Sequence, residues 1–163
     1  MRPLTSARMR ACSRGLTLIE IMVALVISAL VLTFAAPHMG DYFTNTRMRE
    51  GLHSVMAQAL LAQSEALKRN TPVRLAVTTN AATVTVIASG NVIATQTLLP
   101  GLESTTGTID FGANGLPTPL GASLQLVVSQ TGVTCSADMR CPRLNVDGGG
   151  GVRVCGDSTG SCP

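Results

Sequence analysis

The chain has 163 residues, of which 45% are hydrophobic, 13% are charged and 2% are aromatic, and its formal net charge is +3. If part of this length is used for an N-terminal leader and a membrane anchor, the rest has room for one small domain. One Tyr, three Phe and no Trp are too few to build a stacking surface for bases or sugars. Residues 1–15 carry four Arg and no acid. The rest of the chain therefore has eight basic and nine acidic side chains and is not a generally basic nucleic-acid binder.

An apolar segment follows this basic N-terminus. Between Leu16 and Ala36 the only charged residue is Glu20, and the next charge is Asp41. About 20 apolar residues span a bilayer as a helix, and basic flanks stay in the cytoplasm. We therefore expect one membrane span with the C-terminal part outside the cytoplasm, although Thr33-Phe34-Ala35 also fits the cleavage site of an ordinary secretory signal peptide.

The residues at the start of the apolar segment carry a family resemblance. Gly15-Leu16-Thr17-Leu18-Ile19-Glu20-Ile21 resembles the class III signal of type IV pilins and type II secretion pseudopilins, with Leu16 where Phe is commoner. The resemblance implies cleavage by a prepilin peptidase between Gly15 and Leu16, N-methylation of Leu16, and a role for Glu20 in assembly. A plain single-span anchor would explain the apolar run but not the arrangement of Gly15 and Glu20.

Glu20 is the one acid in this segment. A carboxylate within hydrocarbon costs roughly 3 kcal/mol, so such a residue is a functional-site hypothesis by default. In a filament of packed helices, Glu20 would pair with the α-amino group of Leu16 in a neighbouring subunit. The plainer alternative places Glu20 at the level of the lipid headgroups.

The helix is expected to continue beyond the span as an amphipathic second half. Pro37 can kink it and Gly40 can loosen it. Apolar residues then recur at three- and four-residue spacing: Met48, Leu52, Val55, Met56, Ala59, Leu60, Ala66 and Leu67. Lys68 and Arg69 suit a helix C-terminus, and Asn70-Thr71-Pro72 ends the helix.

From Val73 the apolar period changes to two, which is typical of β-strands. Strands are predicted at 73–78, 83–88, 92–99, 108–111, 123–129, 143–147 and 152–155. The loops between the strands at 73–99 are too short for parallel crossovers, so we expect these strands to form an antiparallel meander. Turns are expected at 80–82, 89–91 and 114–115 and at the tetraglycine 148–151, while Pro117 and Pro119 exclude a central strand. A striped helix followed by such strands predicts an α+β domain.

The C-terminal part narrows the resemblance. Cys141-Pro142-Arg143-Leu144-Asn145-Val146 and Gly150-Gly151-Val152-Arg153-Val154-Cys155 resemble the GspH/FimT branch of the pilins, which contains pseudopilin H and minor pilins of the FimT and FimU type. The resemblance implies a pilin-like fold, in which a long N-terminal helix with a transmembrane half and an amphipathic half packs on an antiparallel β-sheet domain. It also implies a minor type IV pilin that joins, and helps to initiate, the filament.

We accordingly expect four parts: a cleaved leader (1–15), a transmembrane and filament-core helix (16–39), an amphipathic helix (40–70) and a β-rich domain with disulfides (71–163). The implied partners are the prepilin peptidase, the inner membrane and other pilins or pseudopilins. The implied location is a single pass through the inner membrane with the C-terminal domain in the periplasm, and the pilus filament or its tip after assembly.

Four cysteines lie near the C-terminus: Cys135, Cys141, Cys155 and Cys162. An even set in an exported domain predicts disulfides, with three possible connectivities. Adjacent pairing, Cys135 with Cys141 and Cys155 with Cys162, closes the shortest loops. A zinc site is the rival interpretation, but no C-x-x-C pair is present and His38 and His53 lie far upstream. We expect neither a metal nor another cofactor.

A second function hypothesis is a pilus-borne DNA receptor. FimT-like members carry a C-terminal G-R-x-R motif, and the matching residues here are Gly150-Gly151-Val152-Arg153, with Gly151 in place of the first arginine. Arg153, with Arg143 and Arg140 near it, would bind DNA weakly and in a salt-dependent way. The alternative is that these three arginines are solvated surface charges.

A third hypothesis is pseudopilin H of a type II secretion system. No catalytic set is visible, so we expect no enzyme.

Overall fold

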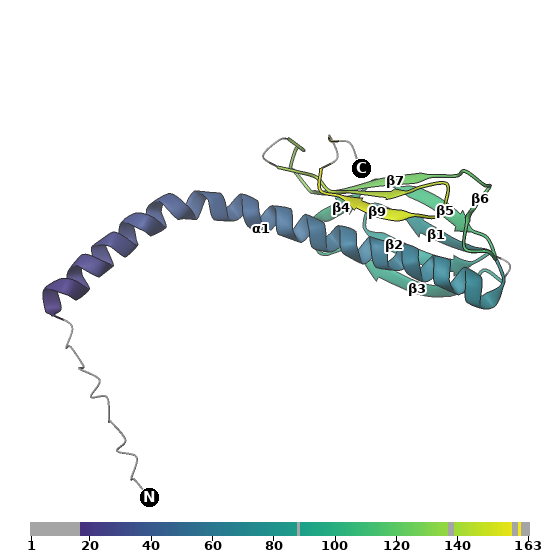
Figure 1. Cartoon of the computed structure of the whole chain (residues 1–163), viewed down its shortest axis with the longest axis horizontal. Coiled ribbons are helices and arrows are strands. Elements are labelled where there is room, and N and C mark those ends of the chain that lie inside the picture. Colours follow the sequence, from purple (N-terminus) through teal and green to yellow (C-terminus); the bar gives the residue numbers. More distant parts are fainter. Residues whose placement is uncertain (1–16, 88, 137–138, 158–159, 161–163) are drawn as a thin grey trace, which may run out of the picture. The chain divides into compact units, whose positions relative to one another are not determined.

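A computed structural model describes residues 17–87, 89–136, 139–157 and 160, except for the side chains at 35–38. The chain divides into two compact units, Met1–His38 and Met39–Pro163, and each is described by itself. One helix, α1 (Leu18–Arg69), contributes residues to both units (Figure 1).

The first unit contains the start of α1. Thr17 caps the helix: its carbonyl oxygen accepts from the backbone N–H groups of Glu20 (3.1 Å) and Ile21 (3.2 Å), and its Oγ1 lies 3.3 Å from the Glu20 nitrogen. Every described side chain from Leu18 to Phe34 is exposed. By length and composition, no single helix among the described residues qualifies as a membrane span, whereas Leu18–Phe34 and Met39–Arg69 qualify when taken as a pair.

In the second unit, α1 packs through one narrow stripe. The buried residues follow each other at intervals of three or four: Met48, Leu52, Val55, Ala59, Ala62 and Ala66. The predicted stripe was wrong at two positions, because Leu60 and Leu67 are 45% and 54% exposed, and it omitted Ala62. Successive residues are about 100° apart around a helix, so Leu60 and Leu67 lie about 100° away from the buried Ala59 and Ala66.

Among the described residues, nine strands form two sheets in which every pair is antiparallel. The first has the order β3-β2-β1-β5-β6 and consists of β1 (Val73–Val77), β2 (Ala81–Val86), β3 (Val92–Thr97), β5 (Gly107–Phe111) and β6 (Pro117–Thr118). The second has the order β4-β7-β8-β9 and consists of β4 (Leu102–Ser104), β7 (Leu124–Gln130), β8 (Arg143–Val146) and β9 (Val152–Cys155).

The strands β1, β2 and β3 form the expected antiparallel meander, but the strands after β3 do not continue it. The chain leaves the first sheet after β3, forms β4 in the second and returns to place β5 beside β1, with Leu75 opposite Ile109. The sequence did not predict β4, which has only three residues, or β6. Pro117 is accommodated in β6 because that strand is at the edge of its sheet, where one side needs no backbone donor.

The turns mostly follow the prediction. Gly90 and Gly115 have positive φ, at 67° and 73°, in the expected turns. The expected turn at 80–82 is displaced, because β2 already begins at Ala81 and the Thr78 N–H donates to the Ala81 carbonyl over 2.8 Å.

One hydrophobic core joins the amphipathic part of α1 to both sheets. Its largest fully buried side chains include Phe111 and Leu75 from the first sheet, Leu126 and Leu144 from the second, and Met48 and Leu52 from the helix. The fold is thus α+β, with a long helix packed on antiparallel sheets.

Candidate functional site

The predicted processing and assembly residues lie at the N-terminus. Gly15 and Leu16 are outside the described residues. Glu20 is exposed in the first turn of α1, where the positive end of the helix dipole favours an acid. Thr17 and Glu20 also have the spacing of a capping box, a local role that the sequence analysis missed.

The structure brings two of the three predicted DNA-contacting arginines to one face. In the β8–β9 hairpin, Arg143 pairs with Cys155 and Asn145 pairs with Arg153, so Arg143 and Arg153 lie diagonally on the same side. Arg153 is 60% exposed, with its Nη2 3.8 Å from Asp147 Oδ2. Arg143 Nη2 donates to the Gly160 carbonyl over 3.1 Å, and its Nε is buried without a hydrogen-bond partner among the described residues.

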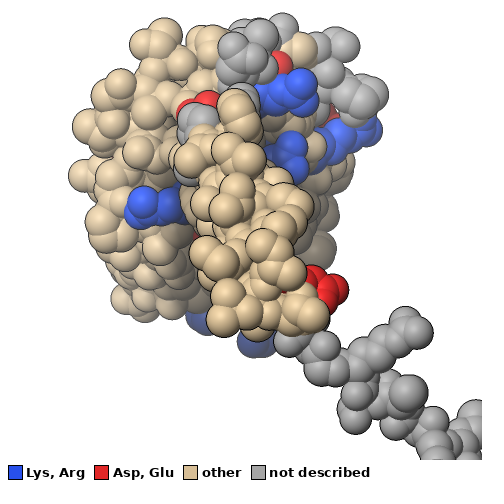
Figure 2. All heavy atoms as spheres, turned by 90° about the vertical axis from the view of Figure 1, so that its left-hand side faces the viewer, with Lys and Arg blue, Asp and Glu red and all other residues tan. Residues whose placement is uncertain are grey.

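The third predicted residue, Arg140, is exposed in the loop that the first disulfide closes. Figure 2 views one face of the molecule, where uncharged residues form most of the surface and Lys and Arg only a small part.

The tetraglycine turn is fixed by Asp147, a residue that the sequence analysis did not single out. Asp147 Oδ1 accepts from the N–H groups of Gly149 (3.0 Å) and Gly151 (2.8 Å). Gly150 has a φ of 83°, and its carbonyl accepts from Gln63 Nε2 of α1 over 3.2 Å. These amides already donate to a carboxylate within the chain, which is a different arrangement from a cradle for a bound phosphate.

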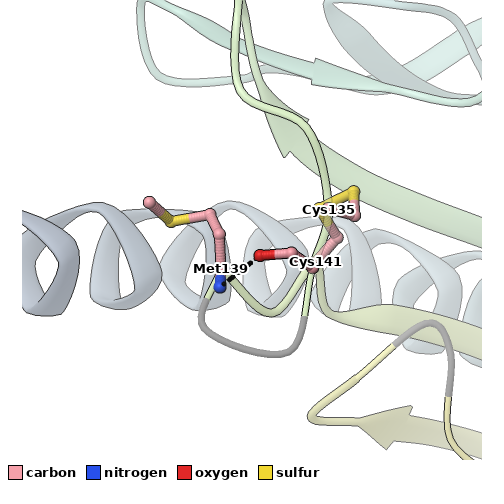
Figure 3. Close-up of a disulfide and its surroundings, with 4 residues drawn as sticks. Cys135, Met139 and Cys141 are labelled. Atoms are coloured by element: carbon pink, nitrogen blue, oxygen red, sulfur yellow. Dashed lines mark hydrogen bonds between the residues drawn. A yellow bond between two sulfur atoms is a disulfide. The ribbon is translucent and has the colours of Figure 1, made fainter.

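The structure contains a disulfide between Cys135 and Cys141, the first of the two expected pairs (Figure 3). Within its loop, the Met139 N–H donates to Ser136 Oγ over 3.1 Å, and Met139 packs against the core. Cys155 is also disulfide-bonded. Its expected partner, Cys162, lies outside the described residues, so the second pairing stays a prediction. In the described part of the chain, no group of three or more His, Cys, Asp or Glu could hold a metal ion.

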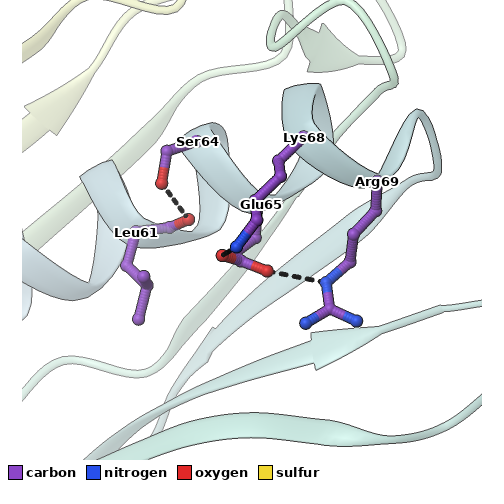
Figure 4. Close-up of polar contacts among 5 residues, drawn as sticks. All are labelled: Leu61, Ser64, Glu65, Lys68 and Arg69. Carbon is purple, nitrogen blue, oxygen red and sulfur yellow. Dashed lines mark hydrogen bonds and ion pairs between the residues drawn. The ribbon is translucent and has the colours of Figure 1, made fainter.

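Charged pairs support the end of α1 and the first sheet. Glu65 accepts from Arg69 Nε over 2.6 Å and lies 3.4 Å from Lys68 Nζ, and the Arg69 hydrogen bond lowers the pKa of Glu65 (Figure 4). Arg74 makes two bonds to Asp110 across β1 and β5, at 2.6 and 2.7 Å, which raise the pKa of Arg74. We assign these pairs to stability.

Two family models match the sequence. The prokaryotic N-terminal methylation motif matches residues 10–36, and the model of type II transport protein GspH matches residues 52–160. The first match includes Glu20, and the second includes most of the amphipathic helix and all nine strands that the structure describes. No curated protein matches the sequence.

The fold is similar to that of the type IV minor pilin FimU of Pseudomonas aeruginosa (strain PAO1), in two crystal forms. In one, the TM-score is 0.56 and the identity 16%, and the match covers 69% of this chain and 91% of the FimU chain. In the other, the TM-score is 0.53 and the identity 18%, with 65% and 90% covered. At such identities the likeness concerns the fold, a long N-terminal helix packed on antiparallel sheets.

Proposed function

The chain belongs to the GspH family of type II transport proteins and to the type IV pilin superfamily, and on this premise we propose that it is a minor type IV pilin that enters the pilus filament and helps to initiate it. The pilin family and fold are structural, and the function that we propose is assembly without catalysis.

The observation that carries the proposal is the apolar surface of α1 within the residues that match the methylation motif. Leu18 and Phe34 are each 77% exposed, and every described side chain between them is exposed as well. An apolar surface of this extent requires a partner. A bilayer covers it before assembly, and the helices of neighbouring subunits cover it in a filament.

Glu20 gives this packing its register. Within a bundle of apolar helices, an unpaired carboxylate is costly. Cleavage after Gly15 creates an α-amino group on Leu16, and pairing of Glu20 with that group on a neighbouring subunit satisfies both charges. The pairing fixes how far one helix is displaced along the next.

Replacement of Glu20 tests this proposal. The variants Glu20→Ala and Asp41→Ala are compared in the producing organism, by immunoblotting of sheared pili and of membranes. We expect Glu20→Ala to remain in membranes and to be absent from pili, because its helix lacks the pairing charge, while Asp41→Ala enters pili normally. Normal entry of Glu20→Ala into pili would remove the assembly role.

A second proposal is DNA binding, which the shared face of Arg143 and Arg153 favours. Each phosphate contact adds salt-dependent affinity. Binding of duplex DNA to the purified chain is measured at low and moderate salt, beside Arg153→Ala and the control Arg69→Ala. Salt-sensitive binding that only Arg153→Ala weakens supports a receptor, and absence of binding at low salt rejects it.

A third proposal is a pseudopilin of a type II secretion system, which the name of the matching family favours. Deletion of the gene separates it from a pilin. Loss of protein secretion with normal pili supports a pseudopilin, whereas loss of pili with normal secretion supports a minor pilin.

A further inference from the structure

Apolar side chains remain uncovered where the second unit begins. Tyr42 and Phe43, two of the four aromatic residues of the chain, are 66% and 57% exposed, and Met39 is 54% exposed. The rings of Tyr42 and Phe43 contact each other edge to face, with centroids 6.0 Å apart. Phe111, by contrast, is completely buried in the core. The sheets therefore do not cover this end of the amphipathic helix.

These three side chains lie on one side of α1. At about 100° per residue, Met39, Tyr42 and Phe43 fall within an arc of about 100°. Asp41 is about 150° from the middle of that arc, on the other side of the helix. The segment thus presents an apolar side with two aromatic rings only five residues after Phe34, at the end of the apolar run.

Two arginines follow the rings along the helix, one beyond each edge of the apolar side. Arg47 follows Phe43 by four residues and Arg49 follows Tyr42 by seven, so they lie about one and two helical turns further along nearly the same lines. Both are exposed, and Arg47 Nη2 donates to the Pro100 carbonyl over 3.0 Å. That bond uses one part of a guanidinium that has five N–H donors. Glu50 lies on the same side and follows Phe43 by seven residues, as Arg49 follows Tyr42, so two arginines and one acid lie beyond the rings.

We propose that the segment Met39–Arg49 contacts the surface of a phospholipid bilayer before assembly and so holds the C-terminal unit there. We call this contact the membrane seat. Met39, Tyr42 and Phe43 insert at the headgroup level, where amphipathic aromatic side chains are favoured. Arg47 and Arg49 contact the phosphates of anionic lipids, with their apolar stems beside the rings. The inference rests on the proposed function, because the membrane seat requires Leu18–Phe34 to be inserted in the same bilayer.

Single tryptophans test the membrane seat, because the chain has no Trp of its own. Tyr42→Trp, Phe34→Trp and Leu120→Trp are made in the whole chain and reconstituted into vesicles of phosphatidylethanolamine and phosphatidylglycerol. The acyl chains carry bromine either near the headgroup or near the chain end. Phe34→Trp reports insertion of the span. Leu120→Trp, at a position that is 78% exposed, is the control in water.

We expect Tyr42→Trp to emit at shorter wavelength than Leu120→Trp and to be quenched more by bromine near the headgroup than by bromine near the chain end. If Phe34→Trp is quenched and Tyr42→Trp is not, the membrane seat is overturned and the proposed function stands. If neither is quenched, the membrane anchor itself fails. A shift of Tyr42→Trp that depends on protein concentration and not on brominated lipid assigns the segment to subunit contact and overturns the proposal.

The arginines are tested in the Tyr42→Trp background with Arg47→Gln and Arg49→Gln together. We expect less quenching than in the parent when phosphatidylglycerol is present and no difference when phosphatidylcholine replaces it. Equal quenching of parent and variant in anionic vesicles would overturn the contact between the arginines and the lipid phosphates.

Discussion

Gly148 begins the turn between β8 and β9 and lies against the backbone of Gly121. A Cβ at residue 148 would be 2.7 Å from Gly121 Cα and 3.0 Å from its carbonyl carbon and oxygen. Because backbone atoms cannot rotate away, Gly148→Ala must separate the two loops. We expect the free energy of unfolding to fall by about 1–3 kcal/mol, measured by thermal unfolding of the chain in detergent followed by circular dichroism.

Gly149→Ala is the matched control in the same turn. Its nearest neighbour would be Asp147 Oδ1, a side-chain atom at 3.3 Å. We expect a change in the free energy of unfolding of at most about 0.5 kcal/mol. Equal losses in the two variants would mean that contact with Gly121 is not what requires glycine at 148.

Glu65 gives the folded state a dependence on pH. The hydrogen bond from Arg69 holds the pKa of Glu65 below the ordinary value of 4.5. Since the folded-state pKa is the lower one, the stabilisation is full above the unfolded pKa and is lost as the pH falls through the folded pKa. We expect Glu65→Gln to lower the unfolding temperature slightly at neutral pH and not at all in strong acid. A difference that is constant across this range would contradict the assignment.

At the scale of elements, Gln63 joins α1 to two loops. Its Nε2 donates to the carbonyls of Gly115 (2.9 Å) and Gly150 (3.2 Å). Gly115 lies in the loop between β5 and β6 of the first sheet, and Gly150 lies in the loop between β8 and β9 of the second. Gln63→Met keeps the length of the side chain and leaves both carbonyls without this donor. We expect a loss of about 1–3 kcal/mol in the free energy of unfolding.

Gln96→Met is the control for Gln63→Met. Gln96 Nε2 also donates to a backbone carbonyl, that of Thr97, but at the exposed edge strand β3, where water replaces the bond. We expect a change of at most about 0.5 kcal/mol. A loss as large as that of Gln63→Met would show that burial of the carbonyls does not determine the effect.

The elements themselves were largely predictable from local pattern. The end of α1 at Arg69 and strands β1, β3, β5, β7, β8 and β9 follow from apolar period and from turn residues. Leu60 and Leu67 were misassigned because hydrophobicity alone does not distinguish the centre of a stripe from its margin. Ala62 was missed because its small side chain gives a weak signal, although small residues are what allow a sheet to approach a helix closely.

At the scale of the whole molecule, the disulfide between Cys135 and Cys141 joins its loop to the core, where Cys141 is completely buried. Non-reducing peptide mapping is expected to link Cys135 to Cys141 and Cys155 to Cys162, and a peptide linking Cys135 to Cys155 would contradict this. We expect Cys135→Ser with Cys141→Ser to lower the free energy of unfolding by about 2 kcal/mol, since the bridge closes a short loop. Cys12→Ser, in the predicted leader, is the control and should leave the free energy of unfolding unchanged.

Local residue patterns were enough to predict the features that depend on neighbouring residues: the basic N-terminus and apolar run, the methylation motif with Glu20, the helix end and most strands. They also supplied the resemblance that the family models bear out. The pairing of strands that are distant in the sequence could not be predicted in this way, because the pairing of β1 with β5 depends on which apolar faces fit on α1. The tertiary structure likewise placed Arg143 and Arg153 on one face and made Asp147 and Gln63 important, since their partners are backbone groups that no residue pattern reveals.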